Sequence, residues 1–481
     1  MISTNYARLY AVLTLLFIFL FPTTNFGQNE EIPVTTESQE ASSYFMEGRY
    51  KYENIQYASA AALFDEAILT DQNFAMAYLY RARCGGGYNI VQKNMQKAES
   101  LIDRVSDGEK YLILFQKALL EADHIAQKEN AMKLMELFPN DKRMHYNVGL
   151  YYDFINDPAT ALMHYFKALN IDEKYAAAYN KIGYDFIDLG FMQSAGEAFK
   201  KYIALIPDSP NPYDSYAELL LKLGKYQESI EQYHLANQKD RLFTQALAGV
   251  GHNYVFLADF EKAREYYHRQ HEEATRTNEK LEALLWIAVS YIHEGNVDEA
   301  LHTLKLRQTF AENAGLLPDI IDTQNLLGIL STETGKYTDA EKYFNDSEKL
   351  IEKSDLEKPV KDSYIVQFHI NKCLLLVKSN KLELAKHTMA ICDKNVVKRN
   401  NLAEIKRMNL VLGLFNLYSG KPKEALNYFN NADTENPYTW YYIAEAYNKL
   451  GYTENAEAFK DRIKYWNQNS FDFALVRNKM E

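Results

Sequence analysis

Large and small apolar residues recur along this chain at a fixed step of 34 residues. Within each step, apolar and small positions repeat at intervals of three and four residues in two separate blocks. Because that interval places side chains on one face of an α-helix, each step is predicted to be a pair of amphipathic helices. The aromatic residues that follow one another at this constant step are Tyr165, Phe199, Tyr233 and Tyr267. The small residues that keep the same step are Ala161, Ala195, Ser229 and Ala263.

Steric considerations assign roles to these positions in the repeat 176–209. Gly183 lies near the middle of the predicted first helix and Ala195 in the second. We expect Gly183 to face Ala195, so that the two helices approach closely and aromatic side chains such as Phe199 fill the remaining volume. Pro207 follows the second helix, at a point where the chain cannot continue helically.

This pattern resembles the tetratricopeptide repeat (TPR) family, whose unit is a helix–turn–helix of about 34 residues. The repeat 176–209 departs from the family pattern at Tyr202, where a small residue is preferred. Its matching residues are Tyr179, Ile182, Gly183, Phe186, Gly190, Ala195, Phe199 and Pro207. The resemblance implies an all-α fold, an α-α superhelix built as a TPR solenoid of about eleven helical hairpins.

The repeats differ in regularity along the chain. A TPR array is predicted over residues 42–278, within which residues 75–141 are degenerate and are interpreted as two hairpins of unusual length. From there the alanines that mark the phase lie farther apart than in the array, which predicts longer hairpins over 279–436, with the second helix of each pair extended. Residues 437–481 are predicted to form a last hairpin and a capping helix. A boundary or change of curvature is predicted near 275–282.

Residues 1–27 have the features of an export signal. Arg8 precedes a largely apolar run, Leu9–Phe21, which is too short to span a bilayer and suits the core of a signal peptide. The sequence therefore predicts a cleaved signal peptide over 1–27 and a periplasmic or secreted protein. The alternative is an uncleaved anchor. Residues 28–41 are polar and acidic, which predicts a flexible linker, and no stable membrane span is expected after cleavage.

Charge and cysteine content narrow the possible functions. The formal net charge is -12 and the pI is near 5.5, so nucleic acid is not expected as a partner. Three cysteines in 481 residues exclude a scaffold built on disulfides. The 37 tyrosines are explained in large part by the repeat pattern.

No catalytic signature stands out in the chain. His268 and His271 lie three residues apart and, with Glu272, could share one helix face, but a zinc site needs at least three well-oriented ligands and a solvated face is expected instead. The glycine cluster at 85–87 lacks the residues of a phosphate-binding loop and is predicted to break a helix. We therefore predict a protein that is not an enzyme, with no catalytic residues, no metal site and no cofactor.

The cysteines are predicted to be separate buried thiols. Cys373 occupies the small position of a first helix, opposite Ala385. Cys392 lies two turns beyond Ala385, or roughly 10 Å along the helix, whereas a disulfide needs Cα atoms within about 7 Å. Cys84 is predicted to be the third buried thiol.

The family resemblance also indicates where a partner would bind. In TPR solenoids the first helices line the concave face, and that groove holds a peptide or protein segment. Asn180 can hydrogen-bond an extended peptide, and Tyr146 and Tyr184 can supply contact area. The alternative is that the groove positions are ordinary solvated residues. The candidates are Tyr146, Leu150, Asn180, Tyr184, Asp214, Glu218 and His252.

One sub-type of the family is disfavoured. Chaperone-binding TPR domains clamp a terminal carboxylate with cations and amides from successive first helices. Here the corresponding positions carry Asp214 and Glu218, with few cations beyond Lys222, so a carboxylate would be repelled. The expected partner is a neutral or basic protein or peptide.

These observations predict a non-catalytic TPR scaffold that mediates protein–protein or peptide binding through its concave groove. The alternative is an extracytoplasmic module that senses a ligand or peptide in a signalling system. An enzyme would need a catalytic segment outside the repeats, and the repeats leave no room for one.

Overall fold

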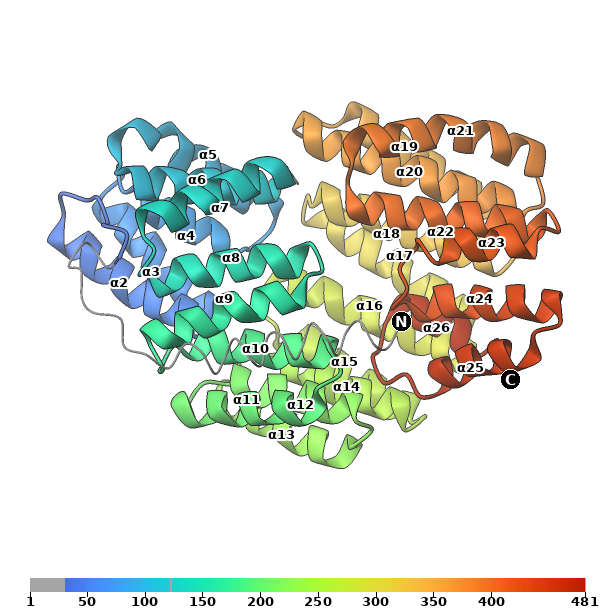
Figure 1. The fold of residues 1–481 in the computed structure, drawn as a ribbon, viewed down its shortest axis with the longest axis horizontal. Helices are drawn as coiled ribbons and strands as arrows, with labels where there is room; N and C mark the ends of the chain where they lie inside the picture. Colours follow the sequence, from blue (N-terminus) through green and yellow to red (C-terminus); the bar gives the residue numbers. More distant parts are fainter. Residues whose placement is uncertain (1–30, 122, 481) are drawn as a thin grey trace. The chain divides into compact units, whose positions relative to one another are not determined.

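The computed structural model describes residues 31–121 and 123–480 (Figure 1). Within these residues the protein is all-α: it has helices and no strands. Twenty-five α-helices, α2 to α26, and one short 3-10 helix follow one another. In the described part, eleven pairs of consecutive helices pack as hairpins, and both helices of each of these pairs lie in the same compact unit. The predicted fold, a solenoid of about eleven hairpins, is confirmed. The predicted signal peptide, 1–27, lies outside the described residues.

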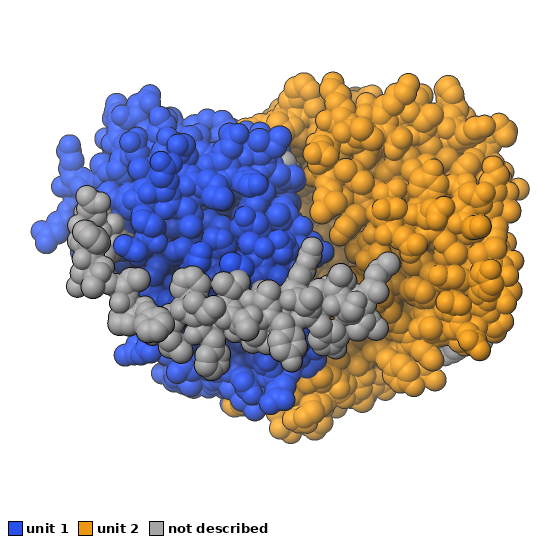
Figure 2. All heavy atoms as spheres, viewed as in Figure 1, with its two compact units in different colours: residues 1–219, 238–240 blue, residues 220–237, 241–481 orange. Residues whose placement is uncertain are grey.

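The chain forms two compact units, coloured separately in Figure 2. Unit 1 ends at Leu219 and includes Gln238–Asp240, and the rest of the chain is unit 2. The segment 275–282, where the sequence predicts a boundary, lies inside unit 2 at the start of α16.

Unit 1 contains α2 (Gln39–Glu53), α3 (Tyr57–Thr70), α4 (Ala75–Arg83), α5 (Tyr88–Ser100), the 3-10 helix η1 (Ile102–Arg104), α6 (Asp107–Leu120), α7 (His124–Leu137), α8 (Lys142–Phe154), α9 (Pro158–Ile171), α10 (Ala176–Asp188), α11 (Met192–Leu205) and the larger part of α12 (Asn211–Lys222). The degenerate segment 75–141 folds as two hairpins, α4/α5 and α6/α7. The glycines at 85–87 form the turn between α4 and α5, and all three have positive φ, which glycine adopts without strain.

Unit 2 contains the larger part of α13 (Tyr226–Lys239), α14 (Gln245–Phe256), α15 (Phe260–Glu273), α16 (Thr277–Glu294), α17 (Val297–Asn313), α18 (Leu317–Glu333), α19 (Tyr337–Lys353), α20 (Lys358–Lys378), α21 (Leu382–Arg399), α22 (Leu402–Tyr418), α23 (Pro422–Phe429), α24 (Pro437–Leu450), α25 (Thr453–Lys464) and α26 (Phe471–Arg477).

From α16 to α22 the helices lengthen in both members of a hairpin, but α23, the second helix of the last of these hairpins, has only 8 residues, in contrast to the predicted extension. Helices α8 to α11 have 13 or 14 residues, whereas α16 to α22 have 17 to 21. The sequence predicts only longer second helices, because the alanines that mark the phase lie on those helices. A longer second helix can bury its apolar face only against an equally long first helix. None of the described helices is both long and apolar enough to cross a membrane.

A glycine in the first helix of a hairpin makes room for an aromatic ring of the second. A Cβ atom added at Gly183 would lie only 2.4 Å from Cε1 of Phe199. The sequence predicts that Gly183 faces Ala195, but the ring of Phe199 is its nearest neighbour, so the glycine accommodates a large side chain. The same contact occurs at Gly149 with Tyr165, Gly251 with Tyr267, Gly328 with Phe344 and Gly413 with Phe429.

The segment before α2 is held against unit 1, in contrast to the flexible linker predicted over 28–41. The backbone N–H of Ile32 donates to Oδ2 of Asp141 at 3.1 Å, and Ile32 is buried. Thr35 donates its N–H and its hydroxyl to the carboxylate of Glu109, at 2.7 and 2.6 Å. Glu109 and Asp141 are buried and need hydrogen-bond donors, which this segment supplies. The composition of the segment, on which the prediction rested, carries no sign of these distant partners.

None of the three cysteines forms a disulfide and all are buried, as predicted, but the thiols of Cys373 and Cys392 share a hydrogen bond. The hydrogen bond between their side chains, followed by burial, raises the pKa of the Cys373 thiol. The rise along α21 alone predicts separate thiols, because it leaves out the reach of the two side chains.

Candidate peptide-binding surfaces

Six of the predicted binding residues lie on three successive first helices of unit 1, and we call them the unit-1 surface. Tyr146 and Leu150 lie on α8, Asn180 and Tyr184 on α10, and Asp214 and Glu218 on α12. The structure brings the residues of α10 and α12 together directly. The seventh predicted residue, His252, lies on α14 in unit 2.

Ser215 of α12 is the centre of the contacts between α10 and α12. The amide of Asn180 donates to Oγ of Ser215 at 2.8 Å, and the hydroxyl of Tyr184 lies 3.2 Å from the same oxygen. Tyr184 also donates to the carboxylate of Glu218. Asn180 is only 4% exposed, so its amide holds two helices together and would have to leave Ser215 before it could bind a peptide. Sequence reasoning missed Ser215, although it lies directly beside the predicted Asp214.

Tyr146 forms the aromatic part of the unit-1 surface. Its ring packs against Tyr165 and Tyr175, with both pairs of ring centroids 5.5 Å apart. Burial, and then the neighbouring Tyr57, raise the pKa of Tyr146 well above its usual value, so this phenol stays neutral. Leu150 follows one turn later on α8 and is half-buried.

Carboxylates give the unit-1 surface its negative charge. Asp214 is half-buried and Glu218 is exposed. Burial, and then the carboxylates of Glu218 and Asp214, raise the pKa of Tyr184 well above its usual value. Burial and the adjacent carboxyl group of Asp153 raise the pKa of Asp185 on α10, so Asp185 stays protonated and adds no negative charge. A cationic group would be attracted here, and an anionic one repelled.

His252 faces a segment of its own chain in unit 2. We call residues 465–480, which include α26, the tail. Nδ1 of His252 lies 3.0 Å from the amide nitrogen of Asn469 in the tail and 2.8 Å from the hydroxyl of Tyr267. Burial lowers the pKa of His252 to about 3, so the imidazole is neutral and Nδ1 can accept a hydrogen bond.

Helix α26 packs on more of unit 2 than the predicted capping of the last hairpin requires. It contacts α16 and α24 as well as α25, and Figure 1 shows it beside α16. The ring of Phe473 stacks on Phe256 of α14 at 6.0 Å and meets His293 of α16 edge-on at 5.4 Å. Helix α26 makes these contacts because it buries its apolar face, with Phe473 and Val476, in the core of unit 2. The asparagines that precede α26 carry no repeat signal, so sequence reasoning missed them.

A cavity of about 420 Å³ lies in unit 2 where the tail ends, and Lys479 of the tail lines it. Glu333 is buried at its wall and makes ion pairs with Lys378 at 2.7 Å and with Lys479 at 2.6 Å. Burial alone would raise the pKa of Glu333, but the two ammonium groups lower it to about 2. Four tyrosines line the same cavity, and they are Tyr337, Tyr418, Tyr441 and Tyr442.

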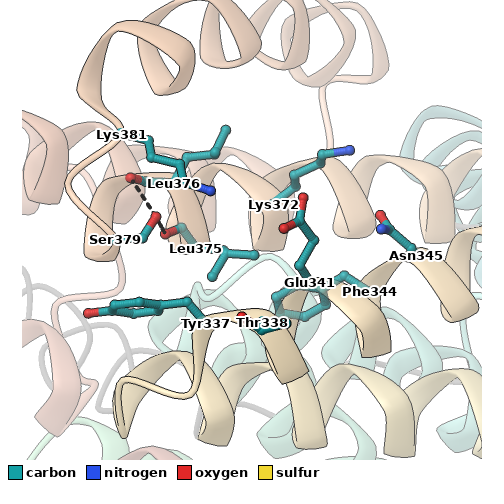
Figure 3. Close-up of a pocket in the computed structure, with 10 residues that line it drawn as sticks. All are labelled: Tyr337, Thr338, Glu341, Phe344, Asn345, Lys372, Leu375, Leu376, Ser379 and Lys381. Atoms are coloured by element: carbon teal, nitrogen blue, oxygen red, sulfur yellow. Dashed lines mark hydrogen bonds between the residues drawn. The ribbon is translucent and has the colours of Figure 1, made fainter.

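A second hollow, between α19 and α20, is too small for a ligand (Figure 3). Its volume is about 70 Å³, which is room for a few water molecules. Its polar groups include Ser379, whose hydroxyl donates to the backbone oxygen of Leu375 at 2.8 Å.

The histidine pair considered from the sequence lies at the end of α15. Nδ1 of His271 is 3.0 Å from the backbone oxygen of Lys280, and the ring packs against Phe310. Among residues 31–121 and 123–480, no three histidine, cysteine or carboxylate side chains come together as metal ligands would.

Among known proteins, this chain is similar to solved structures only. No family model and no curated protein matches this chain. The structure of MamA is 22% identical and covers 35% of this chain and 96% of its own, with a TM-score of 0.28. YrrB, described as a TPR protein with an unusual peptide-binding site, is 19% identical over 39% of this chain and 94% of its own, with a TM-score of 0.27. PilW, described as a type IV pilus biogenesis factor, is 17% identical over 49% and 94%, with a TM-score of 0.29.

The fold itself rests on the hairpins of this chain. The constant spacing from Tyr165 to Tyr267 is that of the repeat pattern, and the contact of a glycine with an aromatic ring recurs from Gly149 to Gly413. These features make the chain an all-α superhelix of helical hairpins, whose repeat is similar to the tetratricopeptide pattern.

Proposed function

We propose that this protein is a non-catalytic scaffold that binds protein or peptide segments through its first helices. The observation that carries the proposal is the unit-1 surface, where tyrosine and carboxylate side chains from α8, α10 and α12 lie on three successive first helices. Aromatic side chains offer a large contact area with little loss of conformational entropy, and carboxylates select a charge. Helical hairpins account for residues 39–464, which supports a scaffold rather than a repeat array with an added catalytic domain.

The proposed partner is a neutral or basic segment. Asp214 and Glu218 would pair with lysine or arginine side chains of the partner, while Tyr146 and Leu150 would contact its apolar groups. The net charge of -12 disfavours nucleic acid and other polyanions. We propose that the protein acts after export, on the basis of the apolar run near its start.

A second candidate function is the sensing of a small ligand or peptide, and the cavity beside Glu333 favours it. Its volume of about 420 Å³ falls within the usual range of ligand pockets, about 300 to 1,000 Å³. A ligand bound there would raise the midpoint of thermal unfolding of unit 2, because it binds only the folded state. A partner that binds the unit-1 surface would leave that midpoint unchanged.

The test of the scaffold uses a charge reversal on the unit-1 surface. Fluorescence anisotropy is measured with a panel of labelled peptides, lysine-rich, neutral and glutamate-rich, on the native chain and on the double variant Asp214→Lys/Glu218→Lys. A matched control is Glu173→Lys/Glu197→Lys, which makes the same change of charge at exposed positions outside the surface. We expect the lysine-rich peptide to bind the native chain and the control, and to lose at least about tenfold in affinity on the Asp214/Glu218 variant.

Two results would contradict the proposal. Equal loss in the control variant would show that only the overall charge matters. Tighter binding of the glutamate-rich peptide to the native chain would show that the surface accepts anions.

A further inference from the structure

The tail crosses the C-terminal ends of four first helices. Those ends lie at Lys222 of α12, Val255 of α14, Ile292 of α16 and Glu333 of α18. The last carbonyl groups of a helix have no partner within that helix, and its C-terminus carries a partial negative charge. A row of such ends presents hydrogen-bond acceptors and attracts cations.

The last residues of the tail supply the matching donors. Nη1 of Arg477 donates to the backbone oxygen of Val255 at 3.0 Å. The amide of Asn478 donates to the backbone oxygens of Ile292 at 3.2 Å and His293 at 3.0 Å. Nζ of Lys479 donates to Glu333 at 2.6 Å. Two cations and an amide therefore occupy three successive helix ends.

The start of the tail is held by two asparagines. The hydroxyl of Tyr226 donates to Oδ1 of Asn467 at 2.7 Å. Asn469 accepts from Nε2 of His293 at 2.9 Å and donates to Nδ1 of His252. Residues 466–470 have no regular structure, so side chains rather than a backbone ladder fix this stretch.

Phe473 is the apolar anchor of the tail. Its side chain is only 2% exposed and fills the space between Phe256 and His293. A partner that takes the place of the tail must therefore bring an aromatic residue of its own.

Departure of the tail uncovers the apolar surface that Phe473, Ala474, Leu475 and Val476 bury, together with polar groups, so a displacing partner must cover both. Water can hydrate the carbonyl oxygens at the helix ends, and Glu333 keeps its ion pair with Lys378. Tyr465, the first residue of the tail, directly follows α25 and is 73% exposed, so the chain can be cut there without disturbing a buried side chain. The tail has the character of a ligand joined to its own receptor.

We propose that the C-terminal ends of α14, α16 and α18 form a second peptide-binding surface, occupied by the tail as a tethered ligand, and that a partner peptide with an aromatic residue followed by cations displaces it. This inference rests on the proposed function, that the chain binds peptides. The partner is defined by the residues it replaces: an aromatic side chain at the place of Phe473 and basic side chains at the places of Arg477 and Lys479.

Tethering sets the size of the expected effect. A short flexible connection gives the tail an effective concentration of about 1 mM at its own surface. A free peptide of the tail sequence must compete with that concentration, so its half-saturation on the intact chain is expected at about 1 mM or above. Once the chain is cut after Tyr465, the released tail is present only at the concentration of the protein. The free peptide then competes with this much lower concentration.

The experiment places a protease recognition sequence after Tyr465 in the full chain. The probe is a fluorescent synthetic peptide of residues 465–481, and its anisotropy is measured before and after cleavage. We expect binding to the cut chain to be at least about 100-fold tighter than to the uncut chain. Probe peptides with Arg477→Glu/Lys479→Glu are expected to bind at least about tenfold more weakly, and a scrambled peptide not at all.

Three results would overturn the inference. In the first, the cut tail remains bound without exchange in excess probe, which would make it a permanent part of the core. In the second, unit 2 unfolds on cleavage, as judged by far-ultraviolet circular dichroism rather than by tryptophan fluorescence, because Trp466 lies in the tail itself. In the third, the charge-reversed peptide binds as well as the native one. The Asp214→Lys/Glu218→Lys change is expected to leave tail exchange unaltered. Loss of peptide binding at the unit-1 surface with normal tail exchange would therefore count against the proposed function alone.

Discussion

Both ends of the described chain lie against their own unit, but by different kinds of bond. In unit 1, backbone and hydroxyl groups of residues 32–35 donate to Asp141 and Glu109, whose side chains are almost completely buried. In unit 2, side chains of the tail donate to helix ends. Departure of the first segment would remove donors from the buried carboxylates of Asp141 and Glu109, whereas departure of the tail would uncover helix-end carbonyl groups and the apolar surface beneath Phe473. The comparison contrasts an end held through buried carboxylates with an end that we propose to be an exchangeable ligand.

The largest expected difference follows from removing one charged hydrogen-bonding side chain at each end. Glu109→Ala leaves the donors of Thr35 and Ser106 without their buried acceptor and is expected to lower the free energy of unfolding of unit 1 by about 3 kcal/mol. Lys479→Ala is expected to cost less than about 1 kcal/mol, because Lys479 is partly exposed and Glu333 keeps Lys378.

Urea unfolding separates the two effects, because all three tryptophans, Trp286, Trp440 and Trp466, lie in unit 2. Glu109→Ala should move the transition seen by far-ultraviolet circular dichroism and leave the transition seen by tryptophan fluorescence unchanged. Equal costs for Glu109→Ala and Lys479→Ala would remove the distinction between the two chain ends.

The packing of glycine on an aromatic ring is shared by both units and can be tested within one of them. Gly183→Ala places a Cβ atom 2.4 Å from the ring of Phe199 and is expected to destabilise unit 1 by about 1 to 3 kcal/mol. Gly196→Ala, in the next helix, meets its nearest atom, Cδ2 of Leu219, at 3.6 Å and is expected to stabilise by about 0.5 to 1 kcal/mol. Thermal unfolding of the two variants would show opposite shifts. A stabilising Gly183→Ala would mean that the ring can move aside.

Acid is expected to weaken unit 2 through the histidines that face the tail. Burial, followed by the positive charge of Arg477, lowers the pKa of His293 to about 3, against 6.5 for the free side chain. Between these values the unfolded chain binds a proton that the folded chain does not, so stability falls as the pH falls below about 6.5. At pH 5 the loss is about 2 kcal/mol for this histidine.

Urea unfolding followed by tryptophan fluorescence at pH 7 and pH 5 measures this loss. His293→Gln keeps a donor for Asn469 and should reduce the dependence on pH. An unchanged slope in that variant would assign the effect to other groups.

Unit 1 is expected to respond in the opposite direction to alkali. The raised pKa of Asp185 means that the folded chain keeps a proton that the unfolded chain has lost, so this contribution to stability falls as the pH rises toward the folded pKa. Asp185→Asn replaces the protonated carboxyl with an amide that can also donate to Asp153. Because the unfolded chain ionises Asp185 from its ordinary pKa of 3.8 upward, the variant should already be more stable than the native chain at pH 7, and its advantage should grow as the pH rises. At pH 9 the variant should unfold at a higher temperature than the native chain, and a lower temperature would refute the shared proton.

The repeat phase was sufficient to predict the hairpins, because each contact within a hairpin joins residues at a fixed separation. The separation between Gly183 and Phe199 recurs between Gly149 and Tyr165 and in other hairpins. The same regularity placed Tyr184 and Glu218, which lie one repeat apart, on one surface.

Contacts between residues outside the repeat could not be predicted from the repeat spacing. Ile32 bonds to a residue 109 positions away, and Asn469 to one 217 positions away. Neither separation is a property of the repeat, so the sequence predicts a flexible linker at one end and a simple cap at the other. Ser215 was missed because a small hydroxyl beside an aspartate carries no phase of its own.

The central claim, that first-helix surfaces bind peptides, is tested most directly by photo-cross-linking. A lysine-rich peptide carrying a photoreactive benzophenone is bound to the full chain and irradiated, and the linked residues are mapped by mass spectrometry. The account predicts cross-links on α8, α10 and α12 that disappear in the Asp214→Lys/Glu218→Lys variant. Cross-links confined to the second helices α9 and α11 would contradict it.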